Sequence, residues 1–327
     1  MYKSKLDIMQ TERMVKFLKT VFEAELSSAL NLSRISAPLF VTKESGLNDN
    51  LNGVERPVSF DVKATGKVVE VVHSLAKWKR YALAKYGFER GSGLYTDMNA
   101  IRRDEDMDNL HSIYVDQWDW EVVIGKEDRN VAFLQSAVRK IYRAIKNTCA
   151  KVREQFPVLS DFLPKDITFV TSQELEDRYP SLTPKQRETE FVKSCGAAFV
   201  MGIGAPLKSG KKHDGRAPDY DDWSLNGDII LYYPPLATAF EVSSMGIRVD
   251  KESLLSQLKA ENCMDRLQLD FHKALLGGEL PLTMGGGIGQ SRLSMFILEK
   301  MHIGEVQVSV WDEKTYAYCK ENNIQLM

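Results

Sequence analysis

The sequence predicts an α+β fold in which a mostly antiparallel β-sheet is flanked by helices. Apolar residues recur at helical spacing over 7–30 and 128–155. The predicted strands come in hairpin-like runs and do not alternate strictly with helices, which disfavours a doubly wound parallel sheet. No linker rich in proline, glycine or serine divides the 327 residues, so we expect one domain over 1–327.

The N-terminal half begins with a predicted helix over 7–30 and a strand over 32–42 that carries Pro38, as suits a sheet edge. Ser74 is the expected N-cap of a later helix. The elements that follow 32–42 are a polar loop at 44–53, strands at 57–64 and 67–72, a helix at 73–86, a hairpin with arms 93–102 and 111–121, and a helix at 128–155.

The C-terminal half mixes short helices and strands before it ends in a glycine-rich strand and a helix. The expected elements are a strand at 167–171, helices at 172–179 and 184–195, a strand at 197–203, a loop at 204–225, strands at 227–233 and 238–249, helices at 251–261 and 264–277, a strand at 283–289 and a helix at 290–300.

Composition excludes several classes of protein. A hydrophobic fraction of 43% and a charged fraction of 27% are typical of a globular protein. A net charge of −2 disfavours a protein that coats nucleic acid. The four cysteines form no CxxC motif and the five histidines no HExxH motif, so we expect reduced thiols and no zinc site. No apolar run is long enough to span a membrane, and we expect a cytoplasmic protein.

The sharpest local signal is the run of glycines from Gly285 to Gly289, followed by Arg292. Glycines let a backbone lie flat beneath a planar ligand. An arginine in the first turn of the next helix can reach a phosphate as a fixed, charged fork. The alternative is a bulged strand end with a surface arginine. A P-loop is excluded because GxxxxGK[ST] does not occur.

The predicted hairpin carries a second signal where Arg102 precedes Asp104, Glu105 and Asp106. Arg102 could stabilise the negative charge that builds at an α-phosphate. The alternative is a solvated loop of mixed charge.

The return arm of this hairpin alternates polar and aromatic residues. Trp118 and Trp120 fall on one face, whereas Gln117, Asp119 and Glu121 share the other. Such a polar face is either ordinary solvent-exposed surface or the floor of a ligand pocket. The tryptophans opposite favour the pocket floor.

Two further segments are rich in charge. Glu241 could hold Mg²⁺ bridged to phosphates, because Mg²⁺ prefers one or two carboxylates with phosphate oxygens; the alternative is an ion pair with Arg248. The acidic segment 216–223 could order over a substrate or form a plain turn. The turn-like segment 48–53 has a bland loop as its default interpretation.

Together these segments resemble the core of class II aminoacyl-tRNA synthetases. Three motifs of that class come in a fixed order: a helix and strand leading to Pro38-Leu39-Phe40, a hairpin arm ending in Ile101-Arg102, and the glycine run ending in Arg292. The chain resembles one family of non-synthetase relatives still more closely, the ammonia-dependent asparagine synthetases, from about residue 6 to 311. The strings that carry this resemblance are EVVHSLAKWKR (70–80), VDQWDWE (115–121), RAPDYDDW (216–223) and SSMGIRV (243–249). The segment after Trp223 is shorter than that family leads us to expect.

The resemblance implies that ATP activates the β-carboxylate of L-aspartate as an adenylate, and that ammonia then releases AMP and L-asparagine. It assigns phosphates to Arg102 and Arg292, Mg²⁺ to Glu241 with Asp228, and support of the adenine to Gly287 and Gly289. It assigns aspartate to Lys79, Gln117, Asp119, Arg216 and Ser244, with Ser74, Asp219, Ser243 and Arg248 as further candidates. Asp49 is the expected proton acceptor. The resemblance also implies a homodimer that binds neither nucleic acid nor a membrane.

Free ammonia as the nitrogen source has independent support. Glutamine-dependent enzymes of the N-terminal-nucleophile kind need a cysteine at the mature N-terminus, whereas residue 2 is Tyr2 and the first cysteine is Cys149.

Two rival functions remain open. A tRNA-charging enzyme would carry an RNA-binding appendage, for which we expect no room around the three motifs. A binding or regulatory subunit without activity would not need Arg102, Glu241 and Arg292 together.

Overall fold

The computed structural model describes residues 2–49 and 55–327, and it confirms the predicted α+β fold. The helices are α1 (Ile8–Leu30), α2 (Ala76–Lys85), α3 (Val131–Gln155), α4 (Ser172–Arg178), α5 (Pro184–Cys195), α6 (Lys251–Ala260), α7 (Asp270–Gly277), α8 (Gln290–Ile297) and α9 (Glu313–Glu321). The strands are β1 (Leu32–Arg34), β2 (Phe40–Thr42), β3 (Ser59–Val62), β4 (Lys67–Val71), β5 (Gly93–Ile101), β6 (Tyr114–Val123), β7 (Thr168–Thr171), β8 (Ala197–Met201), β9 (Asp221–Tyr233), β10 (Thr238–Arg248) and β11 (Thr283–Gly289).

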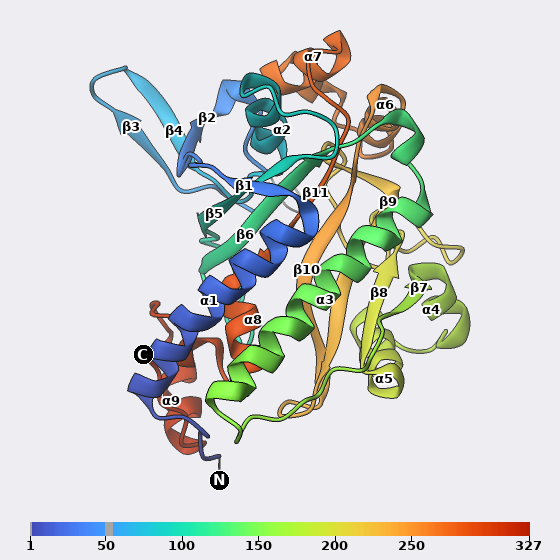
Figure 1. Ribbon diagram of the computed structural model, residues 1–327. Coiled ribbons are helices and arrows are strands. Elements are labelled where there is room, and N and C mark those ends of the chain that lie inside the picture. Colours follow the sequence, from blue (N-terminus) through green and yellow to red (C-terminus); the bar gives the residue numbers. More distant parts are fainter. Residues whose placement is uncertain (1, 50–54) are drawn as a thin grey trace.

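Eight strands form one large sheet in the order β1-β5-β6-β11-β10-β9-β8-β7 (Figure 1). All pairs from β5 to β8 are antiparallel, and only the edge pairs β1–β5 and β7–β8 are parallel. The glycine-rich β11 therefore lies in the middle of the sheet, between β6 and β10. A smaller sheet has the order β2-β4-β3, and its β3–β4 hairpin extends away from the rest of the molecule (Figure 1).

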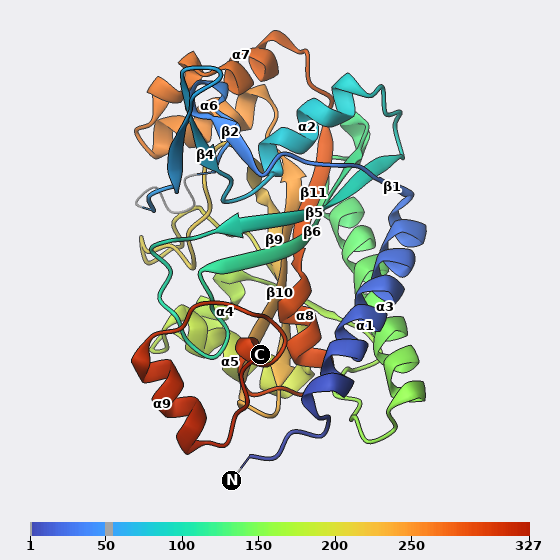
Figure 2. The same ribbon diagram turned by 90° about the vertical axis from the view of Figure 1, so that its left-hand side faces the viewer.

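The two faces of the large sheet are covered differently. Helices α1 and α3 lie side by side on one face, whereas α4, α5 and several loops lie on the other (Figure 2). α1 begins at Asp7, whose side chain accepts a hydrogen bond from the Gln10 backbone N–H in a capping box. Its apolar stripe, which includes Leu18 and Phe22, is fully buried in the main core.

The prediction of one strand over 32–42 was wrong. Residues Leu32–Arg34 form β1, which pairs in parallel with β5 in the large sheet, whereas Phe40–Thr42 form β2, which pairs with β4 in the small sheet. Pro38 lies between them. Because proline lacks an N–H, it cannot continue a strand ladder there, and the chain passes from one sheet to the other.

Several element boundaries also differ from the prediction. β9 begins at Asp221, so the expected loop 204–225 is too long; the polar start of this strand hides its extended conformation. α2 is capped by Leu75 and not by Ser74, whose Oγ accepts a hydrogen bond from the Ala76 N–H at 3.2 Å. The expected helix 264–277 is a 3₁₀ turn (Met264–Gln268) followed by α7. The polar loop 44–53 lies partly outside the described residues.

Two expectations drawn from composition can be compared with the structure. Cys149, Cys195, Cys263 and Cys319 are all free thiols, as predicted. Within the described part of the chain, no helix combines the length and apolarity needed to cross a membrane.

Candidate active site

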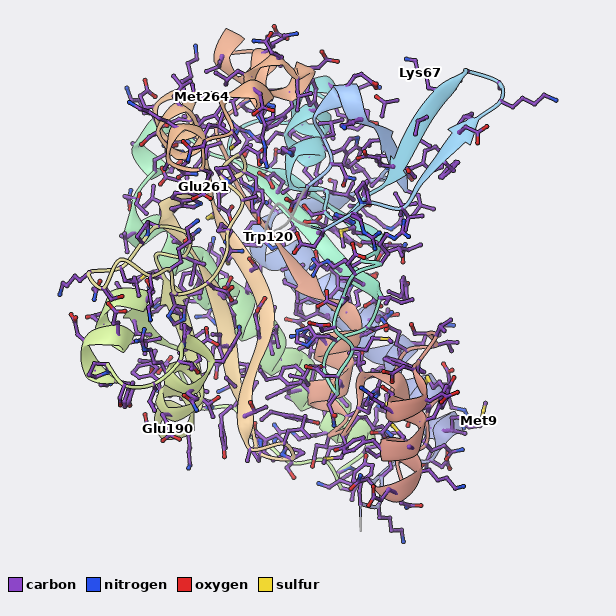
Figure 3. All side chains as sticks on the ribbon, turned by 180° about the vertical axis from the view of Figure 1, so that it is seen from behind. Met9, Lys67, Trp120, Glu190, Glu261 and Met264 are labelled. Atoms are coloured by element: carbon purple, nitrogen blue, oxygen red, sulfur yellow. The ribbon has the colours of Figure 1, made fainter. Side chains whose placement is uncertain are left out.

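A cavity of about 550 Å³ opens on the face of the large sheet that α1 and α3 do not cover. Figure 3 looks at the molecule from behind; Trp120 lies near its centre, whereas Met9, Lys67 and Glu190 lie at its edges. Fourteen of the sixteen residues singled out in the sequence line this cavity: Asp49, Ser74, Arg102, Gln117, Asp119, Arg216, Asp228, Glu241, Ser243, Ser244, Arg248, Gly287, Gly289 and Arg292.

The alternation along β6 supplies the floor of the cavity. Trp118 is fully buried and packs against Phe22 of α1, with the ring centroids 4.6 Å apart and the planes tilted by 47°. Gln117 and Asp119 point to the opposite side and line the cavity. The predicted division into an aromatic face and a polar pocket floor is confirmed for Trp118, Gln117 and Asp119, whereas Glu121 is fully buried and does not line the cavity.

The glycines of β11 make room for the polar side chains of β6. A Cβ added at Gly285 would lie 1.9 Å from Glu121 Oε2, and one at Gly287 would lie 2.2 Å from Gln117 Oε1. Any larger residue would displace these side chains. The glycine run is therefore needed by the protein's own polar floor, in addition to any ligand above it.

Charged side chains alternate in sign beneath the floor. Lys79 contacts Asp119 and lies 3.4 Å from Glu121, which accepts hydrogen bonds from Arg248 at 2.8–3.1 Å. Arg248 also donates to Asp221 at 2.5 Å. Burial acts to raise the pKa of Glu121, but Arg248 and Lys79 outweigh it and lower that pKa. Glu121 thus stays ionised, because it is paired with cations on both sides.

Arg216 joins the loop after β8 to the next two strands. Its Nη1 donates to Ser244 Oγ on β10, and its Nη2 donates to Asp228 Oδ1 on β9 at 2.5 Å. Burial raises the pKa of Asp228 to about 6; the nearby Glu241 adds to this effect and Arg216 opposes it. A guanidinium, a hydroxyl and a carboxylate therefore meet on one wall of the cavity.

Arg292 and Glu241 lie on the adjoining wall. Arg292 Nη1 donates to the backbone oxygen of Glu241 at 2.9 Å, and its guanidinium lies over the ring of Phe240 at 5.6 Å from the centroid. Burial lowers the pKa of Arg292 below its ordinary value. Burial acts to raise the pKa of Glu241, but Lys185 and Arg292 more than offset it, and the carboxylate is ionised at neutral pH.

Arg102 enters the cavity from the loop between β5 and β6. Its backbone N–H donates to the Ile113 carbonyl at 2.8 Å, and its guanidinium lies 3.8 Å from Glu105. In the same loop, Asp104 pairs with Arg56. Arg102 thus lines the cavity and, among residues 2–49 and 55–327, pairs loosely with Glu105.

Two of the singled-out residues lie outside the cavity lining. Lys79 is completely buried below the floor. Asp219 is also buried and accepts from Lys77 at 3.2 Å, Arg266 at 3.0 Å and His272 at 3.0 Å. Burial acts to raise the pKa of Asp219, but Lys77 and its other partners outweigh it and hold that pKa far below its usual range. Both residues shape the site from behind.

Several residues of the cavity were missed in the sequence. They are Lys185, His111, Asp214, Ile303 and Gln307, among others. Lys185 stands in the first turn of a short helix, and the others stand in loops or a 3₁₀ turn without any recognisable motif. Their role follows only from tertiary structure.

A metal in this cavity could use one carboxylate from each of these two walls, Asp228 and Glu241. Among residues 2–49 and 55–327, no cluster of three or more His, Cys, Asp or Glu side chains is arranged to hold an ion. Asp228 and Glu241 nevertheless line the same cavity and influence each other electrostatically. Two hard oxygen donors of this kind fit Mg²⁺ that also binds phosphate.

The fold defines the class of protein. It resembles asparaginyl-tRNA synthetase of Pyrococcus horikoshii, in a structure with asparaginyl-adenylate, at a TM-score of 0.67 and 14% identity over 91% of this chain and 68% of that chain. The asparaginyl-tRNA synthetase of Entamoeba histolytica gives 0.64 and 14%, over 92% of this chain and 66% of its own. The protein thus has the fold of a class II aminoacyl-tRNA synthetase catalytic core.

Sequence similarity identifies one family among the proteins that share this fold. The model of the aspartate–ammonia ligase family matches residues 9–323. A protein of Ruminiclostridium cellulolyticum named aspartate–ammonia ligase is 62% identical over all of this chain and 97% of its own length. One of the same name from Fusobacterium nucleatum is 59% identical over all of this chain and 99% of its own. This chain belongs to the aspartate–ammonia ligase family.

Proposed function

We propose that the protein makes L-asparagine from L-aspartate, ammonia and ATP through a β-aspartyl-adenylate. The observation that carries this proposal is that one cavity, in a member of this family, joins the cations Arg102 and Arg292 to a wall that suits an amino acid, built by Arg216 and Ser244. An adenylating enzyme must hold the phosphates of ATP and the amino acid together, so that the carboxylate can react with the α-phosphorus.

The first step forms the adenylate. An oxygen of the aspartate β-carboxylate attacks the α-phosphorus of ATP, the bond to the bridging oxygen breaks, and pyrophosphate leaves. Arg102 and Arg292 stabilise the negative charge that grows on the α-phosphate. Asp228 and Glu241 would hold Mg²⁺, which neutralises phosphate charge when bound. Gly287 and Gly289 of β11 line the cavity and are the positions that we assign to support of the adenine.

The cavity floor and the Arg216 wall hold the amino acid. Arg216 is placed to bind a carboxylate of aspartate, and Ser244 positions its guanidinium. Gln117 and Asp119 supply an acceptor-rich surface for the ammonium group. Ser74, Ser243 and Arg248 complete the lining, whereas Lys79 and Asp219 act from behind it by fixing Asp119 and the loop before β9.

The second step replaces AMP by ammonia. The nitrogen attacks the acyl carbon, the carbon–oxygen bond to AMP breaks, and one proton must leave the nitrogen. Asp49 is almost fully buried at the cavity wall and is the carboxylate that we assign to this proton. Replacing Asp49 with Ala should therefore impair amide formation more than pyrophosphate exchange.

The products test the proposal. With aspartate, ATP, Mg²⁺ and ammonium, the protein should form asparagine and AMP in equal amounts. Formation of ADP, or the absence of asparagine, would contradict it. Filter binding of labelled tRNA tests the rival synthetase function, for which the proposal expects no binding.

The homodimer and the cytoplasmic location stay predictions. Light scattering during size-exclusion chromatography tests the first, and fractionation of the producing cells tests the second.

A further inference from the structure

Lys185 is a cavity residue that none of the roles above uses. It follows Pro184 at the start of α5, after the N-cap Thr183. α5 lies on the cavity side of the large sheet (Figure 2). The Lys185 side chain lines the cavity, and 67% of it remains exposed, so its ammonium can turn toward a ligand.

The surroundings of Lys185 are acidic but hold it loosely. Its Nζ lies 3.3 Å from Asp214 and 3.5 Å from Glu188. Burial acts to lower the pKa of Lys185, but nearby carboxylates raise it above its ordinary value, so the group stays charged. Those carboxylates are Glu188, Glu241, Asp214 and Asp228.

The helix dipole does not favour a lysine at this position, although Lys185 pairs with Glu188 in the next turn. The first turn of a helix carries the positive end of the helix dipole, where a cation is disfavoured. The first turn of α5 contains no acidic residue that would offset this effect. Lys185 and the helix N-terminus therefore add positive potential to the same end of the cavity.

The backbone that carries Lys185 is firmly fixed. Glu188, one helical turn later, is buried, and its Oε1 contacts His213 Nε2 at 2.9 Å. His213 is itself buried, and it precedes Asp214 in the loop that leads to Arg216. The helix turn is thus clamped to the loop, while the Lys185 side chain, paired with Asp214 and Glu188, remains largely exposed.

We propose that Lys185 binds the β- and γ-phosphates of ATP and the pyrophosphate released from them. This inference rests on the proposed function. Lys185 lines the same cavity as Glu241 and Asp228, the pair assigned to Mg²⁺, and both carboxylates interact electrostatically with its ammonium. A mobile ammonium suits this task, because it can follow the leaving group as the bond to the α-phosphorus breaks.

The test compares three variants. Lys185→Met should raise KM for ATP and for pyrophosphate about tenfold in aspartate-dependent exchange, and leave KM for aspartate within about twofold. Lys185→Arg should retain most of the affinity. Lys193→Met is the matched control, because Lys193 is exposed in the last turn of the same helix, and it should behave as wild type.

Asp214→Asn separates binding from loop positioning, because it removes the pair with Lys185 but keeps the ammonium. If Lys185 binds phosphates, Asp214→Asn leaves pyrophosphate affinity unchanged or strengthens it. If both Lys185→Met and Asp214→Asn raise KM for aspartate and leave pyrophosphate affinity unchanged, Lys185 only positions the Arg216 loop and the proposal is overturned.

Calorimetric titration of magnesium pyrophosphate into wild type and Lys185→Met measures the affinity for pyrophosphate without turnover. Weaker binding by the variant supports the proposal, and equal binding refutes it. A wild-type protein that binds pyrophosphate but makes no asparagine would instead refute the proposed function. Circular dichroism establishes that each variant is folded.

Discussion

The two faces of the large sheet differ in chemistry although the same strands supply both. Trp118 of β6 packs against α1 in the apolar core, and the next residue, Asp119, faces the cavity. On the helix-covered face, burial of apolar surface stabilises the fold. On the cavity face, charged side chains are nearly as buried, yet they form ion pairs instead of a core.

This difference shows how a fold can keep a charged site without losing its stability. Glu121 and Arg248 are each almost inaccessible to water, and both are fully paired. β11 provides the space for this network because its glycines carry no side chains. Substitutions on the helix-covered face should therefore mainly lower stability, and substitutions on the cavity face should mainly lower activity.

The largest effect is expected on the apolar face. Trp118→Ala should lower the free energy of unfolding by about 3–5 kcal/mol, because it leaves a cavity next to Phe22. Denaturant titration measures this change. Val131→Ala, at an exposed position of α3, is the control and should stay within about 0.5 kcal/mol. A loss below about 1 kcal/mol for Trp118→Ala would show that this face does not stabilise the fold as described.

Substitutions on the cavity face should lower the rate of the reaction. Arg292→Ala should reduce aspartate-dependent ATP–pyrophosphate exchange by about 10²–10³-fold, because a positioned cation is lost from the reacting phosphate. The melting temperature should remain close to wild type. Arg143→Ala, on the exposed side of α3, should leave exchange unchanged. Exchange that survives in Arg292→Ala would remove this residue from the phosphate site.

One substitution in β11 should affect both stability and activity. Gly287→Ala should lower the free energy of unfolding by about 1–3 kcal/mol and impair activity, since the new Cβ would collide with Gln117 Oε1. Adding Gln117→Ala should restore the stability but not the activity. If the double variant is no more stable than Gly287→Ala, the collision is not the cause.

The smallest effect is expected from pH at Asp228. Its pKa of about 6 lies above the ordinary 3.8, so its contribution to folding stability is greatest below pH 3.8 and is lost as pH rises through 6. Mg²⁺ binding should instead become stronger as pH rises through 6, because a carboxylate must be ionised to bind the metal. The Mg²⁺ concentration for half-maximal exchange should rise up to about tenfold per pH unit below 6.

Asp228→Asn provides the comparison for this pH effect. The variant should need more Mg²⁺ at every pH and should lose the steep dependence near 6. Because Lys185 and Arg292 keep the pKa of Glu241 low, Glu241 does not titrate in the same range. An unchanged dependence in Asp228→Asn would assign the titration to another group.

Local patterns in the sequence predicted much of the fold and site. The alternation along β6 predicted that Gln117 and Asp119 face the cavity, since strand periodicity does not depend on distant partners. The helical spacing over 7–30 predicted α1 within one residue at its start. The glycine run marked the central strand, although its need to accommodate Gln117 and Glu121 was visible only in the structure.

Features that depend on remote partners were not predictable. The polar start of β9 is extended because Asp221 pairs with Arg248, 27 residues away. The strand is interrupted near Pro38 because the segments on either side of it pair with different sheets, β1 with β5 and β2 with β4. Lys185 enters the site because α5 packs beside the Arg216 loop, and no motif marks it.

One isotope experiment tests the central claim most directly. L-Aspartate labelled with ¹⁸O in both β-carboxylate oxygens is converted with ATP, Mg²⁺ and ammonium, and the products are analysed by mass spectrometry. If the β-carboxylate is adenylated at this cavity, AMP carries one ¹⁸O atom, asparagine keeps the other, and pyrophosphate carries none. Unlabelled AMP, or label in pyrophosphate or in inorganic phosphate, would contradict the β-aspartyl-adenylate.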